Sequence, residues 1–169
     1  MSGVVAAGAL NIRQVVQTGR DVAEAIVVLW TKRIVHRDIK PSNILVSTDG
    51  RSVLIDLGVA RYLEFTTLTA PGHSIGTYGY MSPEQAGASR RLTCKSDIFS
   101  LGIVLQEALS GKHPTLHDQV ALHNGGPSTA TLRQGLPLDL AGLIDSMVES
   151  RPFKRPDPDL VAAELRRML

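Results

Sequence analysis

The segment from Ser96 to Leu109 is the strongest constraint on how this chain can fold. It is long enough for a helix of four turns, and its apolar residues lie on nearly every side of that helix. They are Ile98, Phe99, Leu101, Ile103, Val104 and Leu105. A helix that is apolar all round is stable only where other elements cover it. Gly111 ends the pattern and Pro114 follows it, so we expect one helix in the middle of the core.

Most of the remaining sequence is also helical in pattern. Apolar residues at helical spacing predict a helix over 19–30, with Thr18 as its N-terminal cap and an end near Lys32. Residues 138–148 form a second amphipathic pattern. A third begins at 157, where aspartate and then proline are typical of a helix start, and continues to the end of the chain.

The β-structure predicted by the sequence is small. Two short β-prone runs, 44–46 and 52–55, flank an Asp-Gly pair at 49–50, which is a strong hairpin signal. Residues 33–35 form a further short β-prone run. Residues 58–82 have no periodicity, and a loop of that length is usually functional or disordered. The predicted fold class is therefore mainly α with a small β-hairpin, in one domain over residues 1–169.

The composition excludes several classes of protein. The chain has 169 residues, of which 43% are hydrophobic, and a net charge of +2 without a dense basic run, which argues against nucleic acid as a partner. Its longest strongly apolar run, 25–30, is too short to span a bilayer, so no membrane segment is expected. Cys94 is the single cysteine, which excludes an intrachain disulfide and favours a cytoplasmic location. We expect Cys94 to be a small, semi-buried residue.

The residues best suited to chemistry lie between 36 and 84. The run HRDIKPSN at 36–43 is followed by DLG at 56–58, GT at 76–77 and SPE at 82–84. Asp38 and Asn43 are five residues apart on a loop fixed by a proline, so one can act on a substrate while the other faces a metal. The hairpin should return Asp56 beside Asn43. Any one of these residues alone would more often be a turn or a helix cap, but together they predict a functional site, because so many uncompensated polar groups are costly to keep for structure alone.

In order and spacing these motifs resemble the eukaryotic-type Ser/Thr protein kinase family, in a bacterial-like form, over essentially the whole chain. The part that is similar is the C-terminal lobe of the catalytic domain, with a catalytic loop at 36–43 and an activation segment at 56–84. The resemblance implies transfer of the γ-phosphate of ATP to Ser or Thr of a protein substrate. It also implies Mg²⁺ as the metal, with Mn²⁺ as a substitute.

The resemblance assigns roles to five residues of the catalytic region. Asp38 would be the catalytic base, and Lys40 would neutralise charge on the transferred phosphoryl group. Asn43 and Asp56 would hold the metal. Lys40, Asn43 and Asp56 would also contact the nucleotide, together with Leu45 as the apolar floor under the adenine.

The activation segment carries the regulatory and substrate-binding residues that the resemblance implies. Thr69, Thr67 and Ser74 are candidate phosphorylation sites, of which Thr69 is favoured by its position. Arg37 would pair with the phosphorylated residue, because a guanidinium binds phosphate in a bidentate fork. Thr77 would lie in the segment that binds the substrate residue after the phosphoacceptor, and Thr at this position goes with Ser/Thr substrates.

Other residues are expected to be structural. By the same resemblance, Glu84 and Arg155 form a buried ion pair, while Asp97 holds the backbone of the catalytic loop that contains His36. The remaining histidines show no metal-ligand spacing, and we expect them on the surface or in loops: His73, His113, His117 and His123.

Several kinase motifs are absent from the sequence. There is no Gly-x-Gly-x-x-Gly, and no strand with an ATP-anchoring lysine precedes His36. We therefore expect the N-terminal lobe to be missing and residues 1–169 to be nearly inactive alone. Two alternatives remain: a docking module that no longer catalyses, or a lobe completed by a separate N-terminal-lobe or regulatory chain.

Overall fold

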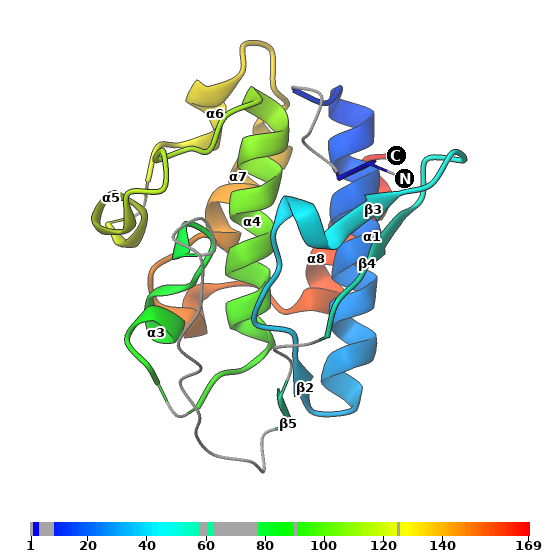
Figure 1. The fold of residues 1–169 in the computed structure, drawn as a ribbon. Coiled ribbons are helices and arrows are strands. Elements are labelled where there is room, and N and C mark those ends of the chain that lie inside the picture. The colour runs from blue at the N-terminus through cyan, green and yellow to red at the C-terminus, as the bar shows by residue number, and fades with distance from the viewer. Residues whose placement is uncertain (1, 4–8, 58–60, 63–77, 90, 125) are drawn as a thin grey trace.

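The structure is a computed structural model that describes residues 2–3, 9–57, 61–62, 78–89, 91–124 and 126–169 (Figure 1). Its helices are α1 (Ile12–Thr31), α3 (Pro83–Ala86), α4 (Cys94–Ser110), α5 (Gln119–His123), α6 (Thr129–Leu132), α7 (Leu138–Met147) and α8 (Pro158–Arg167). Two 3₁₀ turns are η1 (Pro41–Asn43) and η2 (Pro152–Lys154). The strands are β1 (Ser2–Gly3), β2 (Ile34–Val35), β3 (Ile44–Val46), β4 (Ser52–Leu54) and β5 (Arg61–Tyr62). The predicted class, mainly α with a small hairpin, is confirmed.

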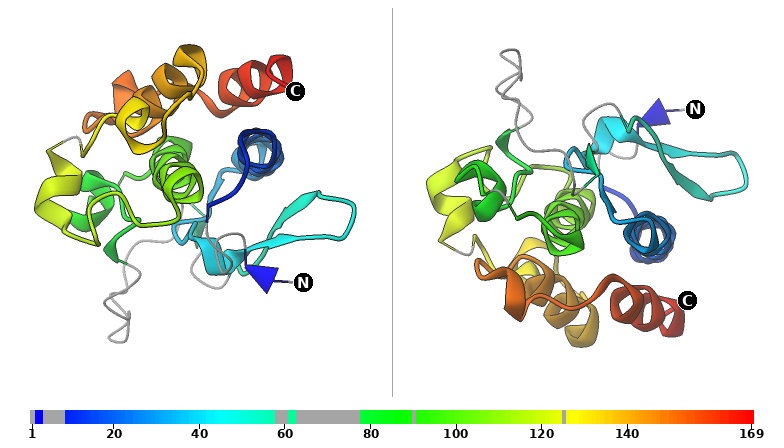
Figure 2. Two further views of the ribbon diagram at one scale, coloured as in Figure 1. Left: turned by 90° about the horizontal axis from the view of Figure 1, so that it is seen from above. Right: turned by 90° about the horizontal axis from the view of Figure 1, so that it is seen from below.

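Helix α4 lies at the centre of the fold, as its sequence predicts. Seen along its axis, it is surrounded by α1, the C-terminal helices and the catalytic loop (Figure 2). Phe99, Leu101 and Ile103 are each at most 1% exposed. The hydroxyl of Thr93 caps the first turn by accepting from the Lys95 N–H. At the other end Gly111 adopts a left-handed conformation with φ of 75°, which glycine adopts without the strain of a side chain.

Helix α1 begins seven residues earlier than the apolar pattern indicates, so the predicted start was wrong. Asn11 is the N-terminal cap: its side chain accepts from the N–H of Gln14 at 2.9 Å, and the Gln14 side chain accepts from the N–H of Asn11 at 3.0 Å. This reciprocal pair starts the helix at Ile12. Thr18 is instead buried inside α1, with its hydroxyl 2.9 Å from that of Ser52. The predicted end of the helix, near residue 32, is confirmed.

Strands β3 and β4 form the predicted hairpin, with β1 on the other side of β3. Ile44 is fully buried and Val46 packs against the core, whereas Val53 is 50% exposed. Since successive side chains of a strand point to opposite faces, Leu45 and its partner Val53 share the face that points away from the core. Gly50, at φ of 83°, makes the turn between the strands. The short strand predicted at 33–35 is present as β2, paired with β5.

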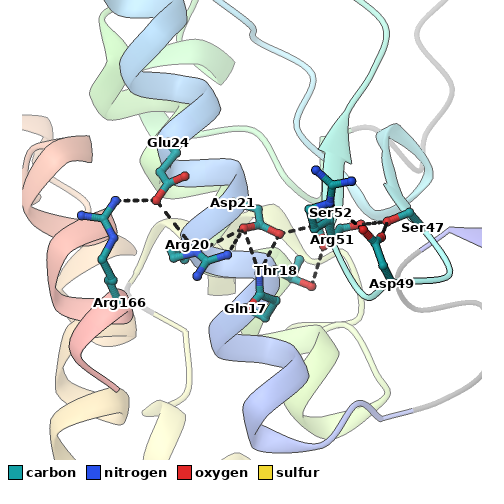
Figure 3. A network of polar contacts seen from close by, with 10 residues as sticks. All are labelled: Gln17, Thr18, Arg20, Asp21, Glu24, Ser47, Asp49, Arg51, Ser52 and Arg166. Carbon is teal, nitrogen blue, oxygen red and sulfur yellow. Dashed lines mark hydrogen bonds and ion pairs between the residues drawn. The ribbon is translucent and has the colours of Figure 1, made fainter. Parts of the chain in front are cut away.

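A network of polar contacts fixes the hairpin to α1 (Figure 3). The Asp21 carboxylate accepts from the Ser52 N–H of β4 at 2.8 Å and from Arg20 at 2.7 Å. One turn further along α1, Glu24 forms an ion pair of 2.6 Å with Arg166 of α8. Helix α1 therefore connects the hairpin on one side with the C-terminal helix on the other.

The rest of the C-terminal half agrees only in part with the sequence pattern. Helices α7 and α8 lie where they are predicted, but α5 and α6 are not predicted by any periodicity. Asp157 occupies the N-terminal cap position of α8, as predicted, but its side chain makes no capping hydrogen bond and is instead bound to Lys95 at 2.8 Å. Cys94 is 3% exposed, and this burial raises the pKa of its thiol to about 11. In the described ranges we find no helix with the length and apolarity needed to cross a bilayer.

Replacing Gly102 by alanine should destabilise the protein. A Cβ at this position of α4 would lie 2.7 Å from Cγ1 of Val148 and 3.1 Å from Cβ of Met147. Despite the higher helix propensity of alanine, we expect urea unfolding to show a net loss of about 1–2 kcal/mol. Gly142→Ala is the matched control, because Gly142 lies exposed on α7 with open space around its Cα, and should gain up to about 1 kcal/mol. Equal changes in the two variants would contradict this account of the α4–α7 contact.

Candidate active site

The predicted catalytic loop, residues 36–43, is held by a carboxylate from the central helix. Asp97, in the first turn of α4, is 1% exposed, and its two oxygens accept from the backbone N–H groups of His36 and Arg37 at 2.9 Å each. Burial raises the pKa of Asp97 to about 6, although the two N–H donors act in the opposite direction. Arg37 has a positive φ of 69°, a conformation that a residue with a side chain seldom adopts. The two hydrogen bonds that Asp97 accepts stabilise this strained turn.

His36 connects the loop to the end of the hairpin. Its ring is fully buried, with Nδ1 accepting from the Asp38 N–H at 3.4 Å and Nε2 lying 3.2 Å from the carbonyl of Ile55. Burial lowers the pKa of His36, while the Ile55 carbonyl and the negative charges of Asp38 and Asp56 oppose this effect. Through its contacts with the Asp38 N–H and the Ile55 carbonyl, the His36 ring joins the backbone of Asp38 to that of Ile55, the residue before Asp56.

Asp38, Lys40 and Asn43 form one cluster. One oxygen of the Asp38 carboxylate, Oδ2, lies 2.9 Å from the Lys40 ammonium and 2.9 Å from the Asn43 amide nitrogen. That amide also donates to the Asp38 carbonyl at 2.8 Å. The other oxygen, Oδ1, is buried and has no hydrogen-bond partner among the described residues. A buried acceptor of this kind is unfavourable unless a further group binds to it. A substrate hydroxyl is such a group, and the geometry suits a general base.

Asp56 follows the hairpin and is exposed, with a positive φ of 66°. The preceding residue, Ile55, donates its N–H to the Asn43 carbonyl at 2.8 Å. This hydrogen bond links the two chain segments on which the predicted metal ligands, Asn43 and Asp56, lie. An amide oxygen and a carboxylate are ligands that suit Mg²⁺. In the described ranges, no three His, Cys, Asp or Glu residues are grouped so that they could hold a metal alone. Asn43 and Asp56 supply ligand types that suit a Mg²⁺ completed by phosphate oxygens and water, the usual arrangement for this ion.

Leu45 lies beside these residues on β3. It is half-buried and pairs across the hairpin with Val53, on the face that points away from the core. Two apolar side chains on this face give a surface on which a planar base can rest. Val53 was missed in the sequence analysis, although the register implied by the Asp-Gly turn places it opposite Leu45.

A buried ion pair joins the end of the activation segment to the C-terminal half. Arg155 is 2% exposed and binds Glu84 in a bidentate fork, at 2.7 and 2.9 Å. Its remaining donors bind carbonyls, and its guanidinium lies 4.8 Å from the ring of Phe99. Burial acts to raise the pKa of Glu84, but hydrogen bonds from Arg155 and Ser96 outweigh it and lower the pKa below its ordinary value. Glu84 is therefore ionised at neutral pH, and the pair is intact there.

Gln85 adds a contact that the sequence analysis missed. Its side-chain amide donates to the Arg37 carbonyl at 2.6 Å, so α3 and the catalytic loop are joined directly. No local pattern marks this glutamine, because its partner is distant in the sequence. The contact places the end of the activation segment next to the loop that carries Asp38.

The predicted sites in the middle of the activation segment lie outside the described residues: Thr67, Thr69, Ser74 and Thr77, as well as His73. Tyr78 is the first described residue after this part of the segment. The hydroxyl of Tyr80 donates to Glu107 of α4 at 2.5 Å, and the Tyr80 carbonyl accepts from Ser100 at 2.7 Å. Helix α4 therefore holds the segment that directly follows Thr77.

The prediction for the histidines was wrong in one case, His123. His113 lies in a loop, as predicted, but it is buried there: it is 6% exposed and its Nε2 lies 2.8 Å from the Gly79 carbonyl. His123 is half-buried in α5. His117 is exposed in a loop, as predicted. The absence of metal-ligand spacing argues against a histidine as a metal ligand, but it does not indicate whether the ring is buried.

The chain belongs to the protein kinase family: residues 3–164 match the protein kinase domain. Its helical fold with a small antiparallel sheet is that of the C-terminal lobe of this domain. The catalytic loop described above thus lies in a known kinase framework.

The chain is similar to several bacterial kinases. The chain is 42% identical over 150 residues to the serine/threonine-protein kinase AfsK of Streptomyces coelicolor, covering 85% of this chain and 18% of that protein. It is 39% identical over 145 residues to the probable serine/threonine-protein kinase PkwA of Thermomonospora curvata, covering 84% and 19%. PknA of Mycobacterium tuberculosis is 32% identical over 164 residues, covering 92% and 38%. The matched region therefore spans about a fifth to two fifths of the length of these relatives.

Arg155→Lys should destabilise the protein strongly. Lysine keeps the charge but cannot form the bidentate fork, and it leaves buried acceptors without donors. We expect urea unfolding at neutral pH to show a loss of about 3–5 kcal/mol, as for the removal of one partner of a buried pair. The matched control is Arg167→Lys, because the Arg167 side chain is 70% exposed in its ion pair with Glu164, and should change stability by less than about 0.5 kcal/mol. Similar losses in both variants would show that the buried fork has no special role.

Proposed function

We propose that this chain supplies the catalytic residues of a Ser/Thr protein kinase, which transfers the γ-phosphate of ATP to a Ser or Thr hydroxyl of a protein substrate. The main support is the Asp38 carboxylate, in which Lys40 and Asn43 hold one oxygen while the buried second oxygen has no partner in the described part of the chain. The kinase names of the bacterial relatives support the same activity.

In this proposal each residue acts at a defined atom. The substrate hydroxyl oxygen forms a bond to the γ-phosphorus while the bond from that phosphorus to the ADP oxygen breaks. Asp38 receives the proton that the hydroxyl loses. Lys40 lies within 2.9 Å of Asp38, so its positive charge is available to the transferred phosphoryl group at the same place. Asn43 and Asp56 would hold Mg²⁺, or Mn²⁺ in its place, and the metal would neutralise phosphate charge when bound.

Other parts of the nucleotide site must come from elsewhere. Residues 1–169 contain no glycine-rich loop and no strand lysine ahead of the catalytic loop. We propose that an N-terminal lobe, in the same polypeptide or in a partner chain, closes over the ATP while Leu45 lies beneath the adenine. A cytoplasmic location accords with this use of ATP and with a single cysteine, Cys94, that is buried as a thiol.

Regulation by phosphorylation is part of the proposal. Thr69, Thr67 and Ser74 are the acceptor sites that we propose, with Arg37 as the residue that pairs with the added phosphate. The backbone of Arg37 is bound on both sides, by Asp97 and by Gln85, so a contact made by its side chain would act directly on the catalytic loop.

Asp38→Asn should abolish activity without unfolding the protein. In the complete encoded polypeptide, we expect kcat for phosphate transfer from MgATP to a Ser/Thr peptide to fall by about 10²–10⁴, because an amide cannot take up the proton. The matched control is Asp49→Asn, since Asp49 lies on the exposed hairpin turn and pairs with Arg51. Thermal unfolding should show that both variants are folded.

A folded Asp38→Asn variant that transfers phosphate at the rate of the parent would show that Asp38 is not the base. If parent and variant are both inactive, and the parent remains inactive with an added N-terminal lobe, the docking-module alternative would hold instead.

Binding of MgATP to residues 1–169 by themselves should be weak. The described site offers the metal ligands and one apolar face but no groups that cover the phosphates, so calorimetry should give a Kd weaker than about 1 mM. Removal of Mg²⁺ with EDTA should abolish the remaining binding. Micromolar affinity would show that this lobe alone suffices to bind the nucleotide.

A further inference from the structure

The loop between α4 and α5, together with the first residue of α5, holds the segment that directly follows Thr77. The His113 ring lies within 2.8 Å of the Gly79 carbonyl through Nε2, and the Gln119 side-chain amide donates to the Tyr78 carbonyl. Two successive carbonyls are therefore bound by side chains from one short stretch of chain. Among the described residues these contacts add to those that Tyr80 makes with α4.

The local hydrogen bonds determine which nitrogen of His113 carries the proton. Nδ1 faces two backbone N–H donors, those of Thr115 at 3.3 Å and His117 at 3.0 Å. An N–H donor needs a lone pair on its partner, so Nδ1 is unprotonated and the proton is on Nε2. Nε2 then donates to the Gly79 carbonyl. The loop thus selects the one neutral tautomer that can bind the segment.

Packing around the ring supports this arrangement. The His117 ring stacks on His113 with 4.0 Å between centroids, and Tyr80 meets His113 edge-on at 5.1 Å. A Cβ on Gly79 would overlap the His117 ring. The backbone at position 79 can approach the two imidazoles this closely only because the residue has no side chain.

We propose that His113 is a positioning residue for the protein substrate: it fixes the backbone of Tyr78–Met81, on which the substrate residue after the phosphoacceptor rests. The inference depends on the proposed kinase function for its kinetic consequence, but the anchoring of the segment itself can be measured without activity. Gln119 assists by binding the neighbouring carbonyl.

The anchor should weaken in acid. Burial lowers the pKa of His113 from 6.5 to about 4, against the opposing effect of the Gly79 carbonyl. In the described part of the chain, the titratable or charged groups near it include His117 and the exposed Lys112 and Asp118 on its own loop. They also include Tyr80 of the anchored segment and Glu107 of α4, which is bonded to Tyr80. Because the released histidine has the higher pKa, the contact is fully stable above about pH 6.5 and weakens as the pH falls towards 4. Protonation in acid would place a hydrogen on Nδ1, where it would clash with the N–H groups of Thr115 and His117, so the charged ring does not fit this arrangement.

Two substitutions separate the hydrogen bond from the packing. His113→Phe keeps a planar ring but has no donor, whereas His113→Gln keeps a donor at a similar reach and does not titrate. In the complete protein at pH 7.5, His113→Phe should speed hydrogen exchange of the 78–81 amides and raise KM for a peptide substrate about tenfold, with kcat and KM for ATP little changed. His113→Gln should restore the exchange rate and the peptide KM of the parent. It should also lack the rise in peptide KM that we expect for the parent between pH 6.5 and 5.

His123→Gln is the matched control, because Nε2 of His123 makes no hydrogen bond within the described ranges, and it should leave exchange at 78–81 unchanged. If His113→Phe exchanges like the parent, His113 does not hold the segment and the inference is wrong. If exchange changes but peptide KM does not, the residue is structural only. If no form of the protein transfers phosphate while exchange responds as described, the kinase proposal fails and the anchoring contact stands.

Discussion

A buried carboxylate in the first turn of the central helix organises the catalytic loop. Asp97 binds the N–H groups of His36 and Arg37 at 2.9 Å each, in a site from which solvent is excluded. Hydrogen bonds to a charged acceptor in a poorly polar surrounding are stronger than neutral ones, so they can maintain the positive φ of Arg37. That turn sets the direction in which the Asp38 side chain points. The turn thus acts together with the hydrogen bonds from Asn43 to fix the position of Asp38, the proposed base.

Helix α4 is also the support for the other elements of the site. Ser96 binds Glu84, Phe99 packs against the Arg155 guanidinium, and Ser100 and Glu107 bind Tyr80. The catalytic loop, the end of the activation segment and the segment after Thr77 are thus all fixed to one helix. A helix buried on every side moves little, since any shift would disturb close packing on all faces. This rigidity suits a reaction that depends mainly on positioning.

The hairpin connects the two proposed metal ligands with the proposed adenine surface. The bond between Ile55 and Asn43 joins the start of β3 to the end of β4, and Asp21 of α1 holds the hairpin from the opposite side. Asn43, Leu45 and Asp56 are therefore parts of one supported unit. Membership in the protein kinase family agrees with this arrangement. The kinase activity itself is our proposal, since the chain covers only part of the length of its relatives.

The sequence by itself determined the central helix, the hairpin, the catalytic loop and the order of the kinase motifs, because these depend on periodicity, turn residues and spacing between near neighbours. It did not locate the start of α1, where an Asn11–Gln14 pair outweighs a weak apolar pattern. Only the tertiary structure decided that one oxygen of Asp38 is held while the other is unpartnered in the described region, and that His113 reaches Gly79. Such contacts join side chains through the fold, over separations for which the sequence carries no local signal.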